Sequence, residues 1–132
     1  MTQLGGSTEA DAFAAADRII DDFGHHRRDR YFAGFARDAT FMFHNVDHRI
    51  ESRAAYEELW GEWEADGFRV RGCTSSNRRI QLVGSVAVFS HDVDTLSEAT
   101  GVTDTTHERE TIVLALTDGT WLGVHEHLSK RE

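Results

Sequence analysis

The stretch from Thr106 to Ser129, THERETIVLALTDGTWLGVHEHLS, decides how this chain folds. Two β-rich runs flank Asp118-Gly119, and this dipeptide between such runs is typical of a two-residue hairpin turn. Thr117 then pairs with Thr120, and the ladder continues away from the turn with side chains alternating between the two faces. The sequence therefore predicts that two long antiparallel strands end the chain.

An uninterrupted register gives this hairpin one face that combines aromatic, basic and acidic side chains. It opposes Glu110 to His127 and Ile112 to His125, and it places Trp121 on the same face as both histidines. An apolar wall with a few polar groups is the usual composition of a small-molecule pocket. We therefore expect this face to line a pocket. A three-residue turn would change the pairs and separate Glu110 from His127.

Length and composition indicate a single domain over residues 1–132, with residues 1–6 as a loose tail. Apolar residues make up 39% of the chain, enough for a real core. The net charge of -9 argues against a nucleic-acid partner, and no apolar run approaches the length of a membrane span. The N-terminal stretch lacks the features of a signal peptide, and the single Cys73 fits a reducing compartment. We expect a cytoplasmic protein.

The remaining patterns predict helices first and then mostly β-structure. Helices are expected from Ser7 or Thr8 to about Arg27, over 30–37 with Asp29 as its cap, and over 53–66 with Ser52 as its cap. Strands are expected over 40–46, 48–51, 68–82 and 83–96, and a polar loop over 97–105 precedes the hairpin. This order indicates an α+β fold with helices on one face of a curved sheet.

Three motifs resemble the SnoaL-like and ketosteroid-isomerase-like proteins, members of the broad nuclear transport factor 2-like superfamily. They are FARDATFMFHN at 35–45, the helix at 54–63, and RET at 109–111 with DGTWLGVHEHLS at 118–129. The resemblance spans nearly the whole chain. It implies a cone-shaped, strongly curved mixed or antiparallel sheet closed by three N-terminal helices (a cystatin-like fold), an internal cavity and usually a homodimer. Members include isomerases, cyclases, dehydratases, hydrolases and carriers without chemistry, so the fold does not select a reaction.

His125 and His127 have three interpretations: acid–base catalysis tuned by Glu110, lining of a pocket without chemistry, or a purely structural role. A metal site is a further hypothesis, because a His-x-His pair with Glu110 and His44 resembles ligand sets for zinc or iron. The spacing alone is weak evidence for metal binding. We therefore expect neither a metal nor another cofactor.

Asp92 and Asp94 share one face of a predicted strand, and His91 lies on the other. In isomerase-like members of the family, a cavity Asp with a raised pKa serves as a base or as a hydrogen-bond donor. The alternative is an acidic edge that faces solvent. The pattern leaves open which face is inside.

The expected function is that of a cofactor-independent isomerase, cyclase or dehydratase acting on an apolar carbonyl compound. The expected catalytic residues are His125, His127, Glu110 and Asp92, and the expected ligand-binding residues are Tyr31, His44, Trp60, Trp121 and Arg109. Aromatic residues on the helices offer an apolar body with one polar tip at the cavity mouth. The resemblance implies an Arg near position 109 that could bind a carboxylate.

Two other functions stay open. The same pocket could hold a small apolar molecule without converting it, or the domain could serve mainly to form homodimers through its sheet. An apolar outer face for such a dimer would consist of Val113, Ala115, Leu122, Val124 and Leu128, unless these residues form the core instead.

Overall fold

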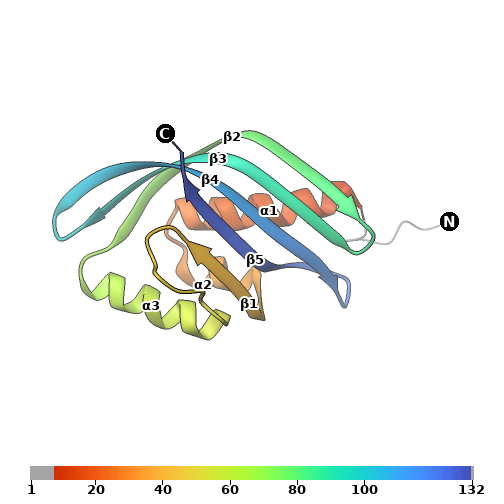
Figure 1. Ribbon diagram of the computed structural model, residues 1–132, viewed down its shortest axis with the longest axis horizontal. Coiled ribbons are helices and arrows are strands. Elements are labelled where there is room, and N and C mark those ends of the chain that lie inside the picture. Colours follow the sequence, from red (N-terminus) through yellow and green to blue (C-terminus); the bar gives the residue numbers. More distant parts are fainter. Residues whose placement is uncertain (1–7, 132) are drawn as a thin grey trace.

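A computed structural model describes residues 8–131 and joins all of its strands in one mixed sheet (Figure 1). The elements are α1 (Glu9–Gly24), α2 (Arg28–Ala33), β1 (Phe35–Phe43), α3 (Arg53–Ala65), β2 (Arg69–Val83), β3 (Val86–Ala99), β4 (Val102–Thr117) and β5 (Thr120–Lys130). The strand order is β1-β5-β4-β3-β2. Strand β1 runs parallel to β5, and the other pairs are antiparallel. The predicted α+β class is therefore confirmed.

Side-chain caps define where two of the helices begin. The hydroxyl of Thr8 accepts a hydrogen bond from the amide of Asp11, and the hydroxyl of Ser52 accepts one from the amide of Ala55. Each bond satisfies an amide that has no partner within its helix, as the sequence predicted. Among residues 8–131, no helix is long and apolar enough to cross a membrane.

The region between α1 and β1 differs from the prediction. Helix α1 ends at Gly24 rather than near Arg27, and α2 begins at Arg28 without a side-chain cap, so Asp29 is not the cap. Strand β1 already begins at Phe35, within the stretch expected to be helical. The short strand expected over 48–51 is reduced to one bridge between Ile50 and Phe41.

Strands β3 and β4 form a longer hairpin than predicted. The polar stretch over 97–105 is not a loop, because β3 continues to Ala99 and β4 begins at Val102. Only Thr100 and Gly101 turn the chain, with φ angles of 52° and 82°. The pairing continues through Ser97–Asp104 and Glu98–Thr103, so polar side chains here extend the sheet.

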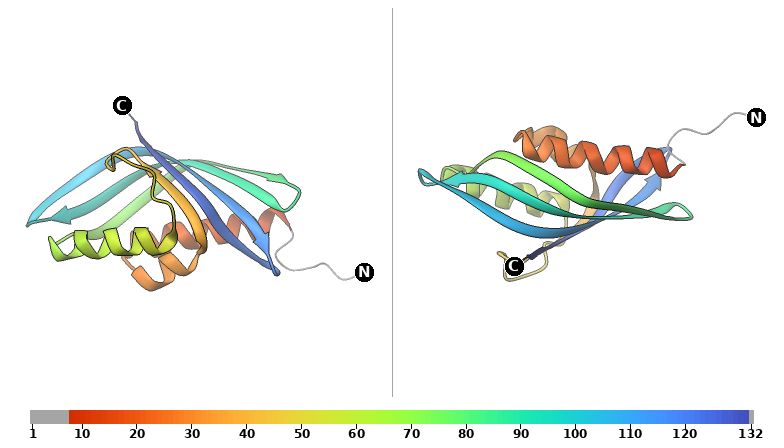
Figure 2. Two further views of the ribbon diagram at one scale, coloured as in Figure 1. Left: turned by 60° about the horizontal axis from the view of Figure 1, so that its bottom comes forward. Right: turned by 90° about the horizontal axis from the view of Figure 1, so that it is seen from above.

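The sheet arches over the three helices, which all lie on its concave side (Figures 1 and 2). Helix α1 packs against β2, and α3 packs against β1. The core is rich in aromatic rings, among which Tyr31, Phe35, Phe41, Tyr56 and Trp60 are almost fully buried. Successive ring contacts of about 4.6–6.1 Å between centroids join α2, α3 and β1 into one apolar layer.

The terminal hairpin has the predicted two-residue turn. Thr117 pairs with Thr120, and Asp118 and Gly119 have φ angles of 50° and 80°. Two consecutive positive φ angles are those of a type I′ turn, which matches the twist of the flanking strands.

The register of this hairpin changes partway along β5. Leu114 pairs with Gly123, but the preceding residue of β4, Val113, pairs with His125, so Val124 has no partner and forms a β-bulge. The extra residue reverses which side chains of β5 face inward beyond that point. The predicted pairs of Glu110 with His127 and of Ile112 with His125 are therefore wrong.

Gly123 lies where β5 passes the ring of Phe35. A methyl group added there would lie 2.6 Å from Cδ1 of Phe35 and 3.6 Å from Cδ1 of Ile19. We predict that Gly123→Ala lowers the free energy of unfolding by about 1–3 kcal/mol, because the buried ring must shift. Chemical denaturation measures the change.

Gly61 provides the matched control, because it lies in α3 and nothing comes within 4 Å of an added methyl group. Gly61→Ala should raise the free energy of unfolding by up to about 1 kcal/mol through helix propensity. Equal effects of the two substitutions would contradict the assigned close approach at Gly123.

Candidate functional site

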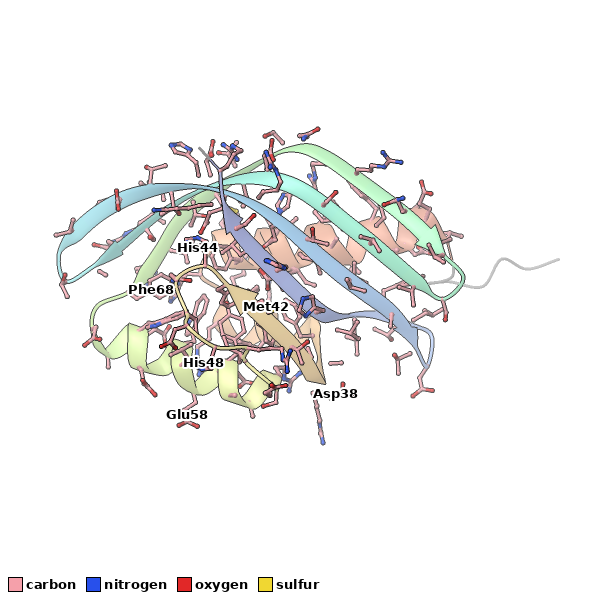
Figure 3. All side chains as sticks on the ribbon, viewed as in Figure 1. Asp38, Met42, His44, His48, Glu58 and Phe68 are labelled. Atoms are coloured by element: carbon pink, nitrogen blue, oxygen red, sulfur yellow. The ribbon has the colours of Figure 1, made fainter. Side chains whose placement is uncertain are left out.

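A cavity of about 760 Å³ lies between the concave face of the sheet and the helices. Tyr31 of α2 and the rings of Tyr56, Trp60 and Trp63 of α3 form part of its wall, with Phe68 just after α3. Figure 3 shows Phe68 and His44 bordering the space between α3 and the sheet. This volume suits a small organic molecule.

Polar side chains from four strands, β2 to β5, meet at the wall of this cavity. The imidazole of His91 on β3 lies 2.6 Å from Oγ of Ser75 through Nδ1 and 2.8 Å from Oε1 of Glu110 through Nε2. The carboxyl group of Glu110 is in turn hydrogen-bonded to that of Glu126. These two glutamates lie diagonally across β4 and β5, since Glu110 pairs with Leu128 and Ile112 with Glu126.

Two tyrosines continue the chain of hydrogen bonds. The hydroxyl of Tyr31 donates to Oε1 of Glu126 over 3.3 Å and lies 2.9 Å from the hydroxyl of Tyr56. Because the proton of Tyr31 points to Glu126, Tyr56 donates to Tyr31. We call Ser75, His91, Glu110, Glu126, Tyr31 and Tyr56 the inner group.

The two carboxyl groups of the inner group hold different protonation states. Burial, together with the nearby charge of Glu110, raises the pKa of Glu126 well above its ordinary value. Burial also raises the pKa of Glu110, but the bond from Glu126 opposes this rise by favouring its ionised form. Two carboxyl groups that are hydrogen-bonded to each other hold one proton between them after the first ionisation. Glu110 ionises first, and the proton stays on Glu126.

The aromatic and imidazole members of the inner group stay uncharged near neutral pH. Burial lowers the pKa of His91 to about 4 and raises the pKa values of Tyr31 and Tyr56 well above their ordinary value. Neutral His91 then donates from Nε2 to Glu110 and accepts from Ser75. With Glu110 ionised and Glu126 protonated, the inner group holds one negative charge and one mobile proton.

A second pair lies closer to the exposed rim. Nε2 of His44, which follows the end of β1, lies 2.6 Å from Oε2 of Glu108, and the hydroxyl of Thr106 donates to the other oxygen of Glu108 over 3.3 Å. Both His44 and Glu108 line the cavity, and Lys130 lies at the rim. We call His44 and Glu108 the mouth pair.

Four of the expected site residues line the cavity, namely Glu110, Tyr31, His44 and Trp60. Their roles stay predictions. Trp121 is buried in the core but is not part of the cavity wall among the described residues.

The bulge places His125 and His127 on the convex side of the sheet, so the expectation that they line the cavity is wrong. Nδ1 of His125 lies 2.9 Å from Oγ1 of Thr40, and His127 is exposed beside Met42 of β1. Asp92 and Arg109 also lie on the convex side, where Nε of Arg109 is 3.2 Å from Oδ1 of Asp92. The histidines and Glu110 thus point to opposite sides of the sheet.

Within the inner group and the mouth pair, four residues that line the cavity were not among the expected site residues: His91, Glu108, Glu126 and Tyr56. His91 could have been found from its phase, because Ala87, Phe89 and His91 form a buried alternating series on β3. Glu126 could not, because an uninterrupted strand would place it opposite the histidines. In residues 8–131 no group of three or more His, Cys, Asp or Glu side chains is arranged to hold a metal ion.

The sequence pattern of the SnoaL-like domain family matches residues 13–130. No curated protein matches the chain. Among solved structures, a nuclear transport factor 2-like protein from Cytophaga hutchinsonii is similar, with a TM-score of 0.79, 13% identity, and coverage of 94% of this chain and 99% of that chain.

Two further structures are similar over nearly their whole length. A ketosteroid isomerase-like protein from Erwinia carotovora atroseptica has a TM-score of 0.78 and 16% identity, covering 94% of this chain and 96% of that chain. The CaMKII hub homology domain of Chlamydomonas reinhardtii has a TM-score of 0.74 and 22% identity, covering 94% of this chain and 98% of that chain. At these identities the likeness shows the fold alone, and it confirms the expected nuclear transport factor 2-like architecture.

The raised pKa of Glu126 makes stability depend on pH. When the pKa of a carboxyl group is higher in the folded state, the group stabilises the fold fully at pH values below its pKa in the unfolded chain, which is near 4.5. This stabilisation is lost as the pH rises toward the pKa of the folded state. Glu126→Gln removes the ionisation and keeps an amide that can donate to Glu110 and accept from Tyr31. We predict that the variant gains stability over the parent above pH 4.5 by up to about 1.4 kcal/mol per pH unit.

Denaturation of both proteins across the pH range measures this difference in the free energy of unfolding. His91 is present in both proteins, so its effect on stability at acidic pH cancels in the comparison. Glu58, an exposed residue that points away from the sheet in Figure 3, supplies the control, and Glu58→Gln should give no pH-dependent difference. A constant difference between parent and Glu126→Gln would contradict the shared proton.

Proposed function

Because this chain belongs to the SnoaL-like domain family, we propose that its cavity binds a small, largely apolar molecule and moves a proton on it without a cofactor. The observation that carries the proposal is the carboxyl pair of Glu110 and Glu126 inside the cavity. One member of the pair is ready to accept a proton and the other to hold one.

The inner group assigns separate roles to its members. Glu110 takes a proton from the carbon next to a carbonyl group, and the carbonyl oxygen gains negative charge as it does so. Tyr56 is the last hydroxyl of the chain that runs through Tyr31 to Glu126. It turns its hydroxyl to that oxygen and stabilises the charge, as preorganised donors do in a water-poor site. Glu110 then returns the proton to a different carbon, which completes an isomerisation.

The expected reaction class is kept, but the residues that perform it change. An isomerase, cyclase or dehydratase acting on an apolar carbonyl compound remains the proposal, with carboxylate chemistry in place of His125 and His127. Their position on the convex side leaves them without access to a molecule in the cavity. Asp92 is likewise replaced by Glu126 as the buried carboxyl group.

Exchange of carbon-bound hydrogen for deuterium tests the proton transfer without knowledge of the natural substrate. In D₂O, a panel of apolar ketones is incubated with the protein, and loss of the signal of the hydrogens next to the carbonyl is followed by NMR. We expect catalysed exchange with at least one ketone. Glu110→Gln should lower its rate by about 10²–10⁴-fold and Tyr56→Phe by about 10²-fold, as losses of a base and of a donor do.

The double variant His125→Ala and His127→Ala is the matched control and should keep the parent rate. Retained exchange in Glu110→Gln, or lost exchange in the histidine variant with its fold intact, would overturn the assignment of roles. Circular dichroism and denaturation establish that each variant is folded.

A binding module without chemistry is the second candidate. It is favoured by one observation: each proton of the inner group already has an acceptor within the group, so the group is satisfied without a substrate. A binder predicts a ligand that co-purifies, found by mass spectrometry, and no exchange with any ketone. An enzyme predicts exchange that depends on Glu110.

Dimerisation through the sheet stays a prediction, and the outer face supports it. Val113, Leu122 and Val124 lie half-buried on the convex side, and Met42 is 41% exposed there. Leu128, expected on this face, lines the cavity instead. A second copy of the chain would cover these apolar side chains.

Val113→Glu with Leu122→Glu should convert a dimer into a monomer, because two carboxylates on each copy would then face each other. Light scattering after size-exclusion chromatography measures the mass. Val102→Glu, at the exposed tip of the β3–β4 hairpin, is the control and should leave the mass unchanged. A parent protein that is already monomeric would refute the dimer.

A further inference from the structure

Carboxyl groups dominate the charged part of the cavity wall. Glu108, Glu110 and Glu126 follow one another on the inner face of β4 and β5, and Glu108 and Glu126 are 7% and 4% exposed. Among the described residues that line the cavity, Lys130 is the only lysine or arginine, and it lies at the exposed rim, where Asp66 also lies. The enclosed part of the wall therefore has no permanent positive charge.

The histidines do not cancel this negative charge. His91 is buried and uncharged near neutral pH, since its pKa falls to about 4. His44 pairs with Glu108 and therefore leaves the charge of Glu110 and Glu126 unbalanced. Once Glu110 has ionised, its negative charge, hydrogen-bonded to Glu126, remains unbalanced within the cavity.

Aromatic rings form much of the opposite wall. The centroid of the Trp60 ring lies 5.2 Å from that of Phe68, 5.4 Å from that of Tyr31 and 6.0 Å from that of Phe23. All four rings line the cavity. The face of an aromatic ring attracts a cation, and the attraction is strongest in a site that excludes water. The same rings bind an apolar body.

We propose that the molecule held by this cavity is an organic cation, with an apolar body and a protonated or quaternary nitrogen that lies against the carboxyl row and the aromatic rings. The inference rests on the proposed function and names its ligand class. An apolar carbonyl compound that also carries such a nitrogen satisfies both, because the carbonyl meets Tyr56 and Glu110 while Glu108 faces the charge.

The same wall rejects anions. A carboxylate or phosphate inside the cavity would lose its water and gain no arginine or lysine partner away from the rim. It would also lie within the field of the charge shared by Glu110 and Glu126, where like charges repel strongly at low dielectric.

Three probes of matched shape test the sign of the ligand charge. Benzyltrimethylammonium is a permanent cation, neopentylbenzene replaces its nitrogen by carbon, and phenylmethanesulfonate carries a negative charge on a group of similar shape. Titrations followed by NMR and by tryptophan fluorescence give each dissociation constant at neutral pH. We expect the cation to bind about 3- to 30-fold more tightly than the neutral probe, and the sulfonate to bind most weakly.

Of the three carboxyl groups of the wall, that of Glu108 has no role in the proposed proton transfer. Glu108→Gln therefore tests how much the negative wall contributes to binding. It should weaken binding of the cation by about 3- to 10-fold and leave the neutral probe unchanged, because only the charge of the wall is altered. The control Glu58→Gln removes a carboxylate of the same type on the far side of α3 and should change neither.

Equal or tighter binding of the neutral or anionic probe by the parent protein would overturn the inference, and so would binding of none of the three. These outcomes do not affect the exchange assay, which uses uncharged ketones and judges the proton transfer separately. Selective binding of the cation without ketone exchange would support the ligand class and identify the domain as a binder.

Discussion

The site depends on a single β-bulge at Val124 in the last strand. Before it, Trp121 and Gly123 face the core, and after it, Glu126 and Leu128 do. Without the extra residue, β5 would turn His125 and His127 inward and Glu126 into solvent. Bulges often re-aim side chains next to functional sites, and this one brings a second carboxyl group beside Glu110.

Placing the carboxyl groups of Glu110 and Glu126 next to each other in a buried site lowers the stability of the fold. Two buried carboxyl groups lose their hydration, and no arginine or lysine in the described part of the chain pairs with either of them. The fold tolerates them because they share one proton and receive hydrogen bonds from His91 and Tyr31. A group kept at such a cost in a cavity is typical of functional sites, where strongly perturbed pKa values concentrate.

Local chemistry made much of the fold predictable. Thr8 and Ser52 are short polar residues that each precede a stretch with helical spacing of apolar residues, and Asp118-Gly119 is a dipeptide that favours tight turns. The starts of α1 and α3 and the turn of the terminal hairpin therefore follow from contacts between residues close in the sequence. The start of β1 did not follow, because Phe35 and its neighbours belong to a strand only through pairing with β5, more than eighty residues later. The extension of β3 and β4 through polar residues has the same non-local origin.

The site was predictable only where it did not depend on that bulge. Tyr31 and Trp60 follow from apolar spacing on helices, and Glu110 follows from its phase with Ile112 and Leu114. Gly123, next to Val124, is a weak local sign, because an isolated glycine in a strand can mark either a bulge or a close backbone approach. The residues around it otherwise alternate as in an ordinary strand. The prediction therefore assigned the right strands to the cavity and, beyond Gly123, the wrong face of β5 to its wall.

The polar cavity residues also explain why the shared architecture leaves the chemistry open. The core rings and the hairpin turns stabilise the fold, whereas the polar side chains that line the cavity can change without refolding it. Glu108, Glu110 and Glu126 occupy such positions. Together these glutamates give the cavity one shared proton and a negative wall, which lies across from the aromatic rings. These properties act on different parts of one molecule. The proton-sharing pair sets what can be done to it, and the charge of the wall sets which molecule enters.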